Sequence, residues 1–548
     1  MSDTPIDVAG APEISTPGFV RKSSGLVRAF SPTDTMLYNL LAMNPVLMSG
    51  LTLTAIVAVF PHANPWLTMV LAGVLCMPLA YVYTLLVSAI PRSGGDYTFQ
   101  SRILGGFPAT VFGFAGIIGA EILAILFIGV TASQIVLSPG LTLLGAYYDS
   151  SALMSVGEWF GTTTGVFFAT LGCAVWASVV NLWGLRRYAQ LQRWSMIIGL
   201  TGLAVVFLIL LFQSKADFIG NFNSFMSSHY NVNDAYQQTV AHGEVSNGFT
   251  LSGTLVALPL AVFSFIFPAW AAQNAGELKK AGSVKMNTYS ILGAQTIAIF
   301  IAGVAAALVV SRIGYDFFAS SGQLFFEGSS HNLLPVPPYF AFFAVLVASS
   351  PAMAILVLVV SLSWLVMWFP NVTVACTRVA LAMSFDGVLP AKVGKVDRRT
   401  HAPVNAILLI FVGYLLMCAL YLVYKNVIAF TSAFIFLSLV TFTVTVIAGG
   451  LFPYLRPKLF AASPPGVQKR ILGIPTITLA AIPFVIFAAW LIYRSFEDER
   501  LEINTTKNML AMAGLYVVSI AIYVVAWYAR KRRSGLSLGD SMRELPVE

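Results

Sequence analysis

The feature that most constrains this chain is a succession of long apolar segments, each able to cross a lipid bilayer. A helix needs about 20 apolar residues to span the hydrocarbon core, and twelve such segments lie between Thr33 and Ala529. Only 10% of the residues are charged, whereas soluble domains carry about 25% charged residues. We therefore expect an all-α polytopic membrane protein with twelve transmembrane helices, in contact with membrane lipids.

Basic residues are distributed unevenly between the two sides of this predicted topology. With the amino terminus in the cytoplasm, 25 of the 31 lysines and arginines fall in cytoplasmic segments. Cytoplasmic loops carry such an excess of positive charge, so the net charge of +8 reflects these loops and not nucleic-acid binding. We expect a multi-pass protein of the plasma (inner) membrane with both termini cytoplasmic, as a monomer or homodimer.

The predicted spans divide the chain into six regions. The eighth span is expected to be one long helix from Tyr339 to Phe385. The regions are a disordered cytoplasmic tail (1–30), helices 1–5 (31–213), an extracellular loop (214–249), helices 6–10 (250–452), helices 11–12 (453–530) and a cytoplasmic tail (531–548).

Two of the predicted spans, the first and the sixth, contain proline where a helix would otherwise continue. Pro45 in the first span leaves the carbonyl of Leu41 without its usual partner, and Pro268 in the sixth does the same to Ser264. A kink filled by neighbouring helices would explain either one alone. Two interruptions at corresponding places in two halves indicate a transporter with inverted repeats.

Glu121 is the only acidic residue deep inside a predicted span. An ionised carboxylate at this depth costs about 3 kcal/mol on insertion scales, so we expect it to face the protein interior. One interpretation is proton coupling or contact with a substrate cation. The alternative is a structural hydrogen bond to a neighbouring helix, for example to Asn181 or a serine.

A possible cation site lies in the eighth span. Asn371 and Thr373 could supply oxygen ligands to sodium, and capping around the Pro370 kink is the alternative. We expect no cofactor and no bound metal, apart from H⁺ or Na⁺ as a coupling ion.

Other classes of membrane protein fit less well. No span holds a cluster of His, Asp and Glu or an HExxH pair, so an intramembrane enzyme is not expected. A channel would show a repeated filter motif. The short polar tails, without a signalling domain, disfavour a receptor derived from a transporter.

Three stretches resemble the amino acid–polyamine–organocation (APC) superfamily of permeases. They carry a Gly-Gly-x-Tyr motif after span 2, a glutamate–lysine ending of span 6, and an Asp-Gly-x-Leu-Pro motif after span 8. These motifs are found at Pro91–Tyr97, Ala275–Lys280, Thr377–Arg378, Ala382–Pro390 and Ala402–Ala406.

The resemblance implies a LeuT-type fold, in which helices 1–5 and 6–10 are inverted repeats and helices 1 and 6 are broken. It also implies alternating-access transport of amino acids or related amines, with the substrate carboxylate at the first break and its ammonium at the sixth. Phe263 and Trp270 would be aromatic gates. The substrate positions carried over are Asn44, Val46, Leu47, Met48, Ser49, Gly50, Phe263, Ser264, Phe265, Ile266, Phe267 and Trp270. Proton-coupled symport is the leading hypothesis, and sodium-coupled symport or exchange is the alternative.

The chain departs from the superfamily pattern at several positions. Many members have a lysine in span 5 about where Gly199 falls, and the small residue usual at the sixth break is replaced by Phe267. Glu277, Arg378 and Asp386 lie at predicted cytoplasmic ends, where we expect a closing network of ion pairs.

Overall fold

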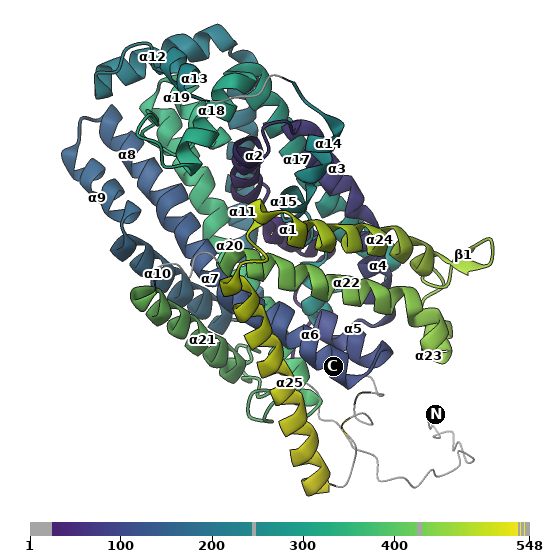
Figure 1. Cartoon of the computed structure of the whole chain (residues 1–548). Coiled ribbons are helices and arrows are strands. Elements are labelled where there is room, and N and C mark those ends of the chain that lie inside the picture. Colours follow the sequence, from purple (N-terminus) through teal and green to yellow (C-terminus); the bar gives the residue numbers. More distant parts are fainter. Residues whose placement is uncertain (1–24, 244–247, 425–429, 535–537, 539–541, 543–548) are drawn as a thin grey trace, which may run out of the picture.

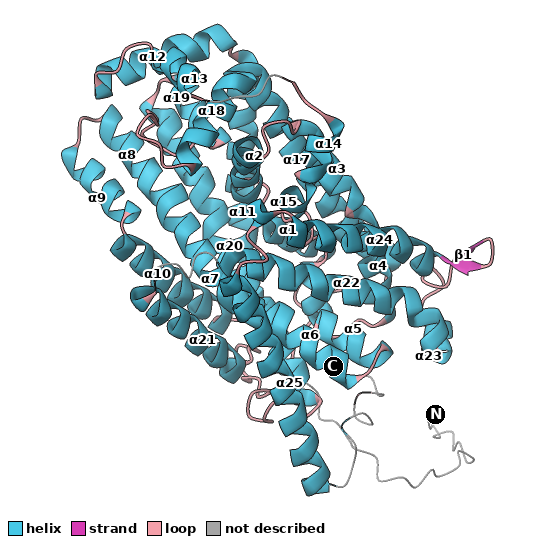
Figure 2. Ribbon diagram, in the orientation of Figure 1, coloured by secondary structure: helices cyan, strands magenta, loops and turns pink. Residues whose placement is uncertain are grey.

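The structure is a computed structural model that describes residues 25–243, 248–424 and 430–534, together with residues 538 and 542. Helices make up nearly all of it (Figure 2). Most of the two predicted tails, 1–30 and 531–548, lies outside the described residues.

Eleven helical segments of the described chain are long and apolar enough to cross a membrane. In their most apolar windows, the first is 94% buried and the last is 17% buried, so the first lies at the centre of the bundle and the last at its edge (Figure 1). The segments are Pro32–Val59, Pro65–Ala89, Gly106–Tyr147, Thr163–Leu182 (α10), Leu185–Phe212 (α11), Val284–Phe326, Pro351–Phe385 (α20), Val404–Val423 (α21), Ser432–Leu455 (within α22, Thr431–Leu455), Thr476–Glu497 (α24) and Thr506–Arg532 (within α25, Thr506–Ser534).

The first segment consists of two helices, α1 (Pro32–Met43) and α2 (Leu47–Val59). A capping box starts α1, because Ser31 Oγ accepts the Asp34 N–H and the Asp34 carboxylate accepts the Ser31 N–H. The helix ends where Asn44 adopts φ 41°, a left-handed conformation that asparagine tolerates better than most residues. Pro45 then blocks continuation, so the first predicted break is confirmed.

The sixth predicted span is not among the eleven because its helices are too short. It begins with α14 (Leu251–Val256) and α15 (Leu258–Val262), continues without helix through Phe263–Ala269, and resumes as the 3₁₀ helices η3 (Trp270–Gln273) and η4 (Ala275–Glu277). The predicted interruption before Pro268 is therefore present, and it is wider than a proline kink.

Hydrogen bonds hold the two broken segments against each other. The Ala271 N–H donates to Asn39 Oδ1 at 2.8 Å, and the hydroxyls of Thr52 and Ser264 are 3.0 Å apart. Beyond η4, the backbone of Phe30 pairs with that of Leu278. The interruptions are thus brought side by side within the bundle.

The third spanning segment contains two π-helical stretches, in which one extra residue is accommodated per turn. They flank the central helix of this segment on both sides. In order, the segment consists of α6 (Gly106–Gly113), η1 (Phe114–Gly119), α7 (Ala120–Val130), η2 (Thr131–Leu137) and α8 (Ser138–Tyr147).

The prediction of a single helix from Tyr339 to Phe385 was wrong. Helix α19 (Phe340–Ala348) ends at Ser349, which has φ 44°, and α20 starts separately at Pro351. Proline favours the first turn of a helix and restricts Ser350 to extended backbone, which explains the separation.

The remaining elements connect the spanning segments or form parts of them. The predicted loop 214–249 is largely helical, since it contains α12 and α13, which gather with α18 and α19 at one end of the bundle (Figure 1). The remaining elements are α3 (Pro65–Leu75), α4 (Met77–Ala89), α5 (Gly95–Ile103), α9 (Ser151–Gly161), α12 (Lys215–Tyr230), α13 (Ala235–His242), α16 (Val284–Asn287), η5 (Thr288–Leu292), α17 (Gly293–Leu308), η6 (Val309–Gly314), α18 (Tyr315–Phe326), α23 (Pro457–Ala461), β1 (Arg470–Ile471) paired antiparallel with β2 (Ile474–Pro475), and η8 (Glu499–Leu501).

Candidate substrate site

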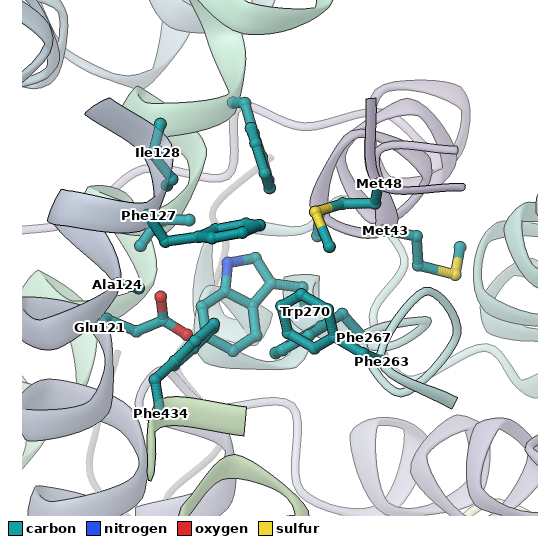
Figure 3. A pocket seen from close by; sticks show the side chains of 13 residues that line it. Met43, Met48, Glu121, Ala124, Phe127, Ile128, Phe263, Phe267, Trp270 and Phe434 are labelled. Atoms are coloured by element: carbon teal, nitrogen blue, oxygen red, sulfur yellow. The ribbon is translucent and has the colours of Figure 1, made fainter. Parts of the chain in front are cut away.

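A closed cavity lies between the two helix breaks and α7 (Figure 3). It has about 20 Å³ in which the centre of a water molecule can lie, which is room for one or two waters. Its lining residues are Ala42, Met43, Met48, Glu121, Ala124, Phe127, Ile128, Phe263, Phe267, Trp270, Trp368, Val372 and Phe434.

Aromatic rings form most of the cavity wall. Phe263 is the common partner, with ring centroids 6.0 Å from Phe127, 5.8 Å from Phe267 and 5.5 Å from Phe434. All three contacts are edge-to-face, the arrangement that aromatic quadrupoles favour. Such a wall suits a ligand with a neutral or apolar side chain.

Glu121 brings a carboxyl group into this aromatic cavity (Figure 3). It is the second residue of α7, directly after the π-helical η1, and it is 2% exposed. Within the described residues its carboxyl makes no hydrogen bond and no ion pair. A buried polar group without a partner is unfavourable, so this carboxyl is available to a proton or a ligand.

A second polar group of the lining is also unpaired. The indole Nε1 of Trp270 is buried without a hydrogen-bond partner among the described residues. Indole offers a donor only, whereas an ionised carboxylate is an acceptor only. The cavity therefore contains one group of each kind.

The backbone at the sixth break leaves acceptors free. The turn is closed by the N–H groups of Ser264 and Phe265, which donate to Ala261 and Val262 at 3.1 and 2.8 Å. The carbonyls of Phe263 to Ile266 accept no hydrogen bond from the described residues. This agrees with the prediction that Pro268 frees the carbonyl of Ser264.

Five of the predicted site residues line the cavity, namely Met48, Glu121, Phe263, Phe267 and Trp270. The other residues predicted at the breaks are buried but do not line it. They are Asn44, Val46, Leu47, Ser49, Gly50, Ser264, Phe265 and Ile266.

Two of these residues have structural contacts that explain their positions. Asn44 Oδ1 accepts the Leu47 N–H at 3.3 Å, which caps the start of α2. Gly50 packs against Phe340 of α19, since a β-carbon at Gly50 would lie 3.4 Å from that ring, an ordinary van der Waals distance.

The residues proposed for a cation lie outside the cavity. Asn371 Nδ2 donates to the Tyr38 carbonyl at 2.9 Å, and the Tyr38 hydroxyl donates to the Asn371 carbonyl at 2.8 Å. Thr373 bonds the Phe369 carbonyl and the Tyr414 hydroxyl. These contacts join α20 to α1 and α21, and they leave Asn371 Oδ1 buried without a partner.

The suggested structural bond between Glu121 and Asn181 is not formed. Asn181 Nδ2 donates instead to the carbonyls of Ala177 and Pro370, at 2.8 and 3.2 Å. Pro370 has no N–H to donate within α20. Asn181, which lies on α10, stabilises this turn of α20 by donating to the Pro370 carbonyl.

Gly199 packs tightly against α20. A β-carbon there would lie 2.7 Å from both Ser363 Oγ and Trp364 Nε1. A lysine at this position therefore requires α11 and α20 to separate, and the uncharged site is a consequence of their close packing.

Paired charges gather beside one end of the broken segments. Arg378 binds Glu277 through two bonds of 2.7 and 3.0 Å, and Arg102 binds Asp386 through bonds of 2.5 and 2.9 Å. The predicted network of Glu277, Arg378 and Asp386 is thus two separate pairs. Arg102, which the sequence did not single out, is the partner of Asp386.

Asp96 in α5 is a further buried carboxyl in this region. Its oxygens accept hydrogen bonds from Tyr83, Gln273 and Thr445, which come from three other elements. Burial raises the pKa of Asp96, while the three donors act in the opposite direction. Phe267 and Trp270 line a small cavity shared with Asp96, so their rings separate Asp96 from the Glu121 cavity.

Several lining residues were not predicted. Ala124 and Ile128 follow Glu121 by three and seven residues, so helical spacing could have found them. Phe127, Trp368 and Phe434 come from three different helices, and nothing local in the sequence marks them.

Spanning helices around an enclosed cavity, with two interrupted segments meeting at it, define the class of membrane transporters. The sequence profile described as "Amino acid permease" matches residues 38–532. The chain therefore belongs to the amino acid permease family, within the APC superfamily. The amino acid permease family is a family of transporters and not of enzymes.

A second similarity is local. Over 96 residues the chain is 30% identical to uncharacterized protein 399 of Sulfolobus islandicus rod-shaped virus 1. The aligned stretch makes up 17% of this chain and 24% of the viral protein. The chain thus matches about a quarter of that relative's length, and the similarity carries no functional argument.

Proposed function

We propose that the protein is a secondary active transporter that moves amino acids or related amines across the plasma membrane by alternating access. The observation that carries this proposal is the enclosed cavity at the two helix breaks, with Glu121 in its wall and no partner for Glu121 among the described residues. Membership of the amino acid permease family supports the substrate class.

The proposed architecture has twelve transmembrane helices, in which the broken segment Leu251–Glu277 is the sixth. Helices 1–5 and 6–10 would be inverted repeats of the LeuT type, and both termini would be cytoplasmic. The interrupted first and sixth helices support this arrangement, because such breaks mark the substrate site in transporters with inverted repeats.

The proposed substrate binds with its charged ends at the breaks and its side chain against the aromatic wall. The free carbonyl of Phe263, a residue of the cavity wall, suits an ammonium group, and the indole N–H of Trp270 suits a carboxylate oxygen. Met43, Met48 and the phenylalanine rings favour a small side chain that is neutral or apolar.

Glu121 is the proposed proton carrier. A carboxyl group that is buried without a partner is neutral at lower cost than it is ionised, so it takes up a proton when the cavity is closed. Opening to water on the low-proton side lets it ionise and release that proton.

The test is uptake of labelled amino acids into proteoliposomes under a proton gradient, a sodium gradient or neither. Wild type is compared with Glu121→Gln, with Glu158→Gln at an exposed position of α9 as the matched control. We expect proton-driven accumulation that is lost in Glu121→Gln and kept in the control. If a proton gradient drives equal accumulation in Glu121→Gln and Glu158→Gln, Glu121 is not the proton carrier.

A sodium-coupled mechanism is the second candidate. The observation that favours it is Asn371 Oδ1, which is buried beside α1 and has no hydrogen-bond partner in the described part of the chain. Amide oxygen is a suitable sodium ligand because it needs no proton. Uptake that requires sodium, falls in Asn371→Ala and is unaffected in Glu121→Gln would favour this candidate. Absence of uptake under any gradient would reject both mechanisms.

A further inference from the structure

A wide, shallow surface hollow lies at the corner where α10 ends and α11 begins, away from the substrate cavity. It has about 590 Å³ and is lined by Trp183, Arg187, Gln190, Leu191 and Trp194. The four residues from α11 recur at intervals of three, four and seven, so they form one face of the helix. We call this hollow the corner site.

The corner site is positively charged, and no acidic side chain of the described residues pairs with this charge. Arg186 and Arg187 are exposed, and neither side chain makes an ion pair or hydrogen bond with the described residues. By contrast, Arg193 on the same helix is bound to Asp34. The N-terminus of α11, at Leu185, has no side-chain cap and adds a partial positive charge.

Two exposed tryptophans border this charge. Trp183 is 39% exposed and Trp194 is 68% exposed. Tryptophan is enriched at the boundary between hydrocarbon and lipid headgroups. The corner site therefore combines the side chains expected at headgroup level with the cation Arg187, and Arg186 lies next to it in the chain, outside the lining.

An apolar groove begins next to the corner site and runs along α10. It has about 450 Å³, and its lining includes Trp159, Phe168, Cys173, Trp176 and Phe369. The rings of Trp176 and Trp183 meet edge-to-face at 5.8 Å, so one tryptophan pair connects groove and corner site.

The groove has the length and rigidity to hold part of an extended hydrocarbon chain. From Trp176 back to Phe168, the stretch of α10 that lines the groove, the helix rises about 12 Å, somewhat less than half of a hydrocarbon core of about 30 Å. The Trp176 ring is fixed, since its Nε1–H donates to the Val366 carbonyl at 2.8 Å.

We propose that these adjoining hollows bind one anionic glycerophospholipid. Arg187, with Arg186, binds the phosphate, Trp183 and Trp194 flank the headgroup, and one acyl chain lies in the groove. Guanidinium groups bind phosphate through paired hydrogen bonds. Anionic lipids are concentrated in the cytoplasmic leaflet, where the proposed topology places this corner.

The test is native mass spectrometry of the full chain, titrated with phosphatidylglycerol or phosphatidylcholine carrying identical acyl chains. We expect one phosphatidylglycerol to bind about 25-fold more tightly than phosphatidylcholine, given two arginines and about a fivefold effect per arginine at a membrane surface. Arg187→Gln should lower this preference about fivefold, Arg187→Lys should keep most of it, and Arg398→Gln, at an exposed arginine elsewhere, should keep all of it.

Trp176→Ala tests the groove separately. It should weaken both lipids equally and leave their ratio unchanged, while unfolding temperatures show that the variants remain folded. The proposal is overturned if wild type binds the two lipids equally, if Arg187→Gln behaves like Arg398→Gln, or if inorganic phosphate displaces the lipid. It is also overturned if Trp176→Ala converts a dimer to a monomer in lipid nanodiscs without changing the bound lipid, because the groove is then a contact between two copies.

Discussion

Glu121 and Asp96 are two buried carboxyl groups on opposite sides of the Phe267–Trp270 partition, and they differ in almost every contact. Asp96 accepts hydrogen bonds from three residues on three elements, whereas Glu121 has no partner among the described residues and faces a cavity. A buried polar group with satisfied partners holds elements together, and one without partners is kept at a cost to stability. The comparison separates an acid with structural partners from the acid proposed to carry the proton.

The largest effect is expected where a full charge would lose its partner. Glu277→Ala leaves the Arg378 guanidinium buried and unpaired, which should lower the free energy of unfolding by about 3–5 kcal/mol. Thermal unfolding in detergent measures this effect. The double variant Glu277→Met with Arg378→Met should recover most of the loss, and a double variant as unstable as Glu277→Ala would show that packing and not charge holds this site.

Removing the structural acid should have the next largest effect. Asp96→Ala leaves three donors without an acceptor, which should cost about 2–3 kcal/mol. Asp217→Ala, at an exposed capping position of α12, is the control and should cost about 1 kcal/mol or less.

The pH dependence of stability, compared between wild type and Asp96→Asn, sharpens the comparison. Because burial raises the pKa of Asp96 above its ordinary value of 3.8, its contribution to stability is complete below pH 3.8 and declines as the pH rises through the raised value. Between pH 4 and 8, wild type should therefore lose more stability than Asp96→Asn. Parallel curves would contradict the raised pKa.

Substitution of Glu121 should change the free energy of unfolding in the opposite direction to substitution of Asp96. Glu121→Met removes a buried polar group that has no partner, so the free energy of unfolding should rise by about 1 kcal/mol. Proton-driven accumulation should be lost in the same variant. If Glu121→Met is instead destabilised as strongly as Asp96→Ala, the carboxyl has a structural partner and the contrast fails.

The smallest effect is expected at the neutral bond between the two breaks. Ser264→Ala removes the hydroxyl that lies 3.0 Å from Thr52 Oγ1, which should cost about 1 kcal/mol. Thr52→Val should cost a similar amount, and the double variant should cost no more than either one. Additive losses would show that the two hydroxyls do not interact.

The broken helices could be predicted because their cause is local. Proline at positions 45 and 268 lacks an N–H wherever the chain folds, and Glu121 is conspicuous in an apolar span. The width of the sixth break was not predictable, since 3₁₀ geometry over Trp270–Glu277 depends on hydrogen bonds such as that from Ala271 to Asn39.

The rest of the cavity depends on contacts between distant helices. Phe127, Trp368 and Phe434 look like ordinary core residues until α7, α20 and α22 are packed together. The same limit applies to Asp96, whose donors Tyr83, Gln273 and Thr445 are far apart in sequence. It also applies to Arg102, which pairs with Asp386 and was not part of the predicted network of Glu277, Arg378 and Asp386.

The closed cavity has a consequence for measured affinity. With about 20 Å³ of space for water, it admits an amino acid only in molecules whose break segments have moved apart. The apparent dissociation constant then equals the intrinsic one divided by the open fraction, so an open fraction of about 1% weakens apparent binding about 100-fold. A substitution that favours opening would strengthen apparent binding without touching the substrate, and the concentration for half-maximal uptake reports this conformational equilibrium as much as the fit of the ligand.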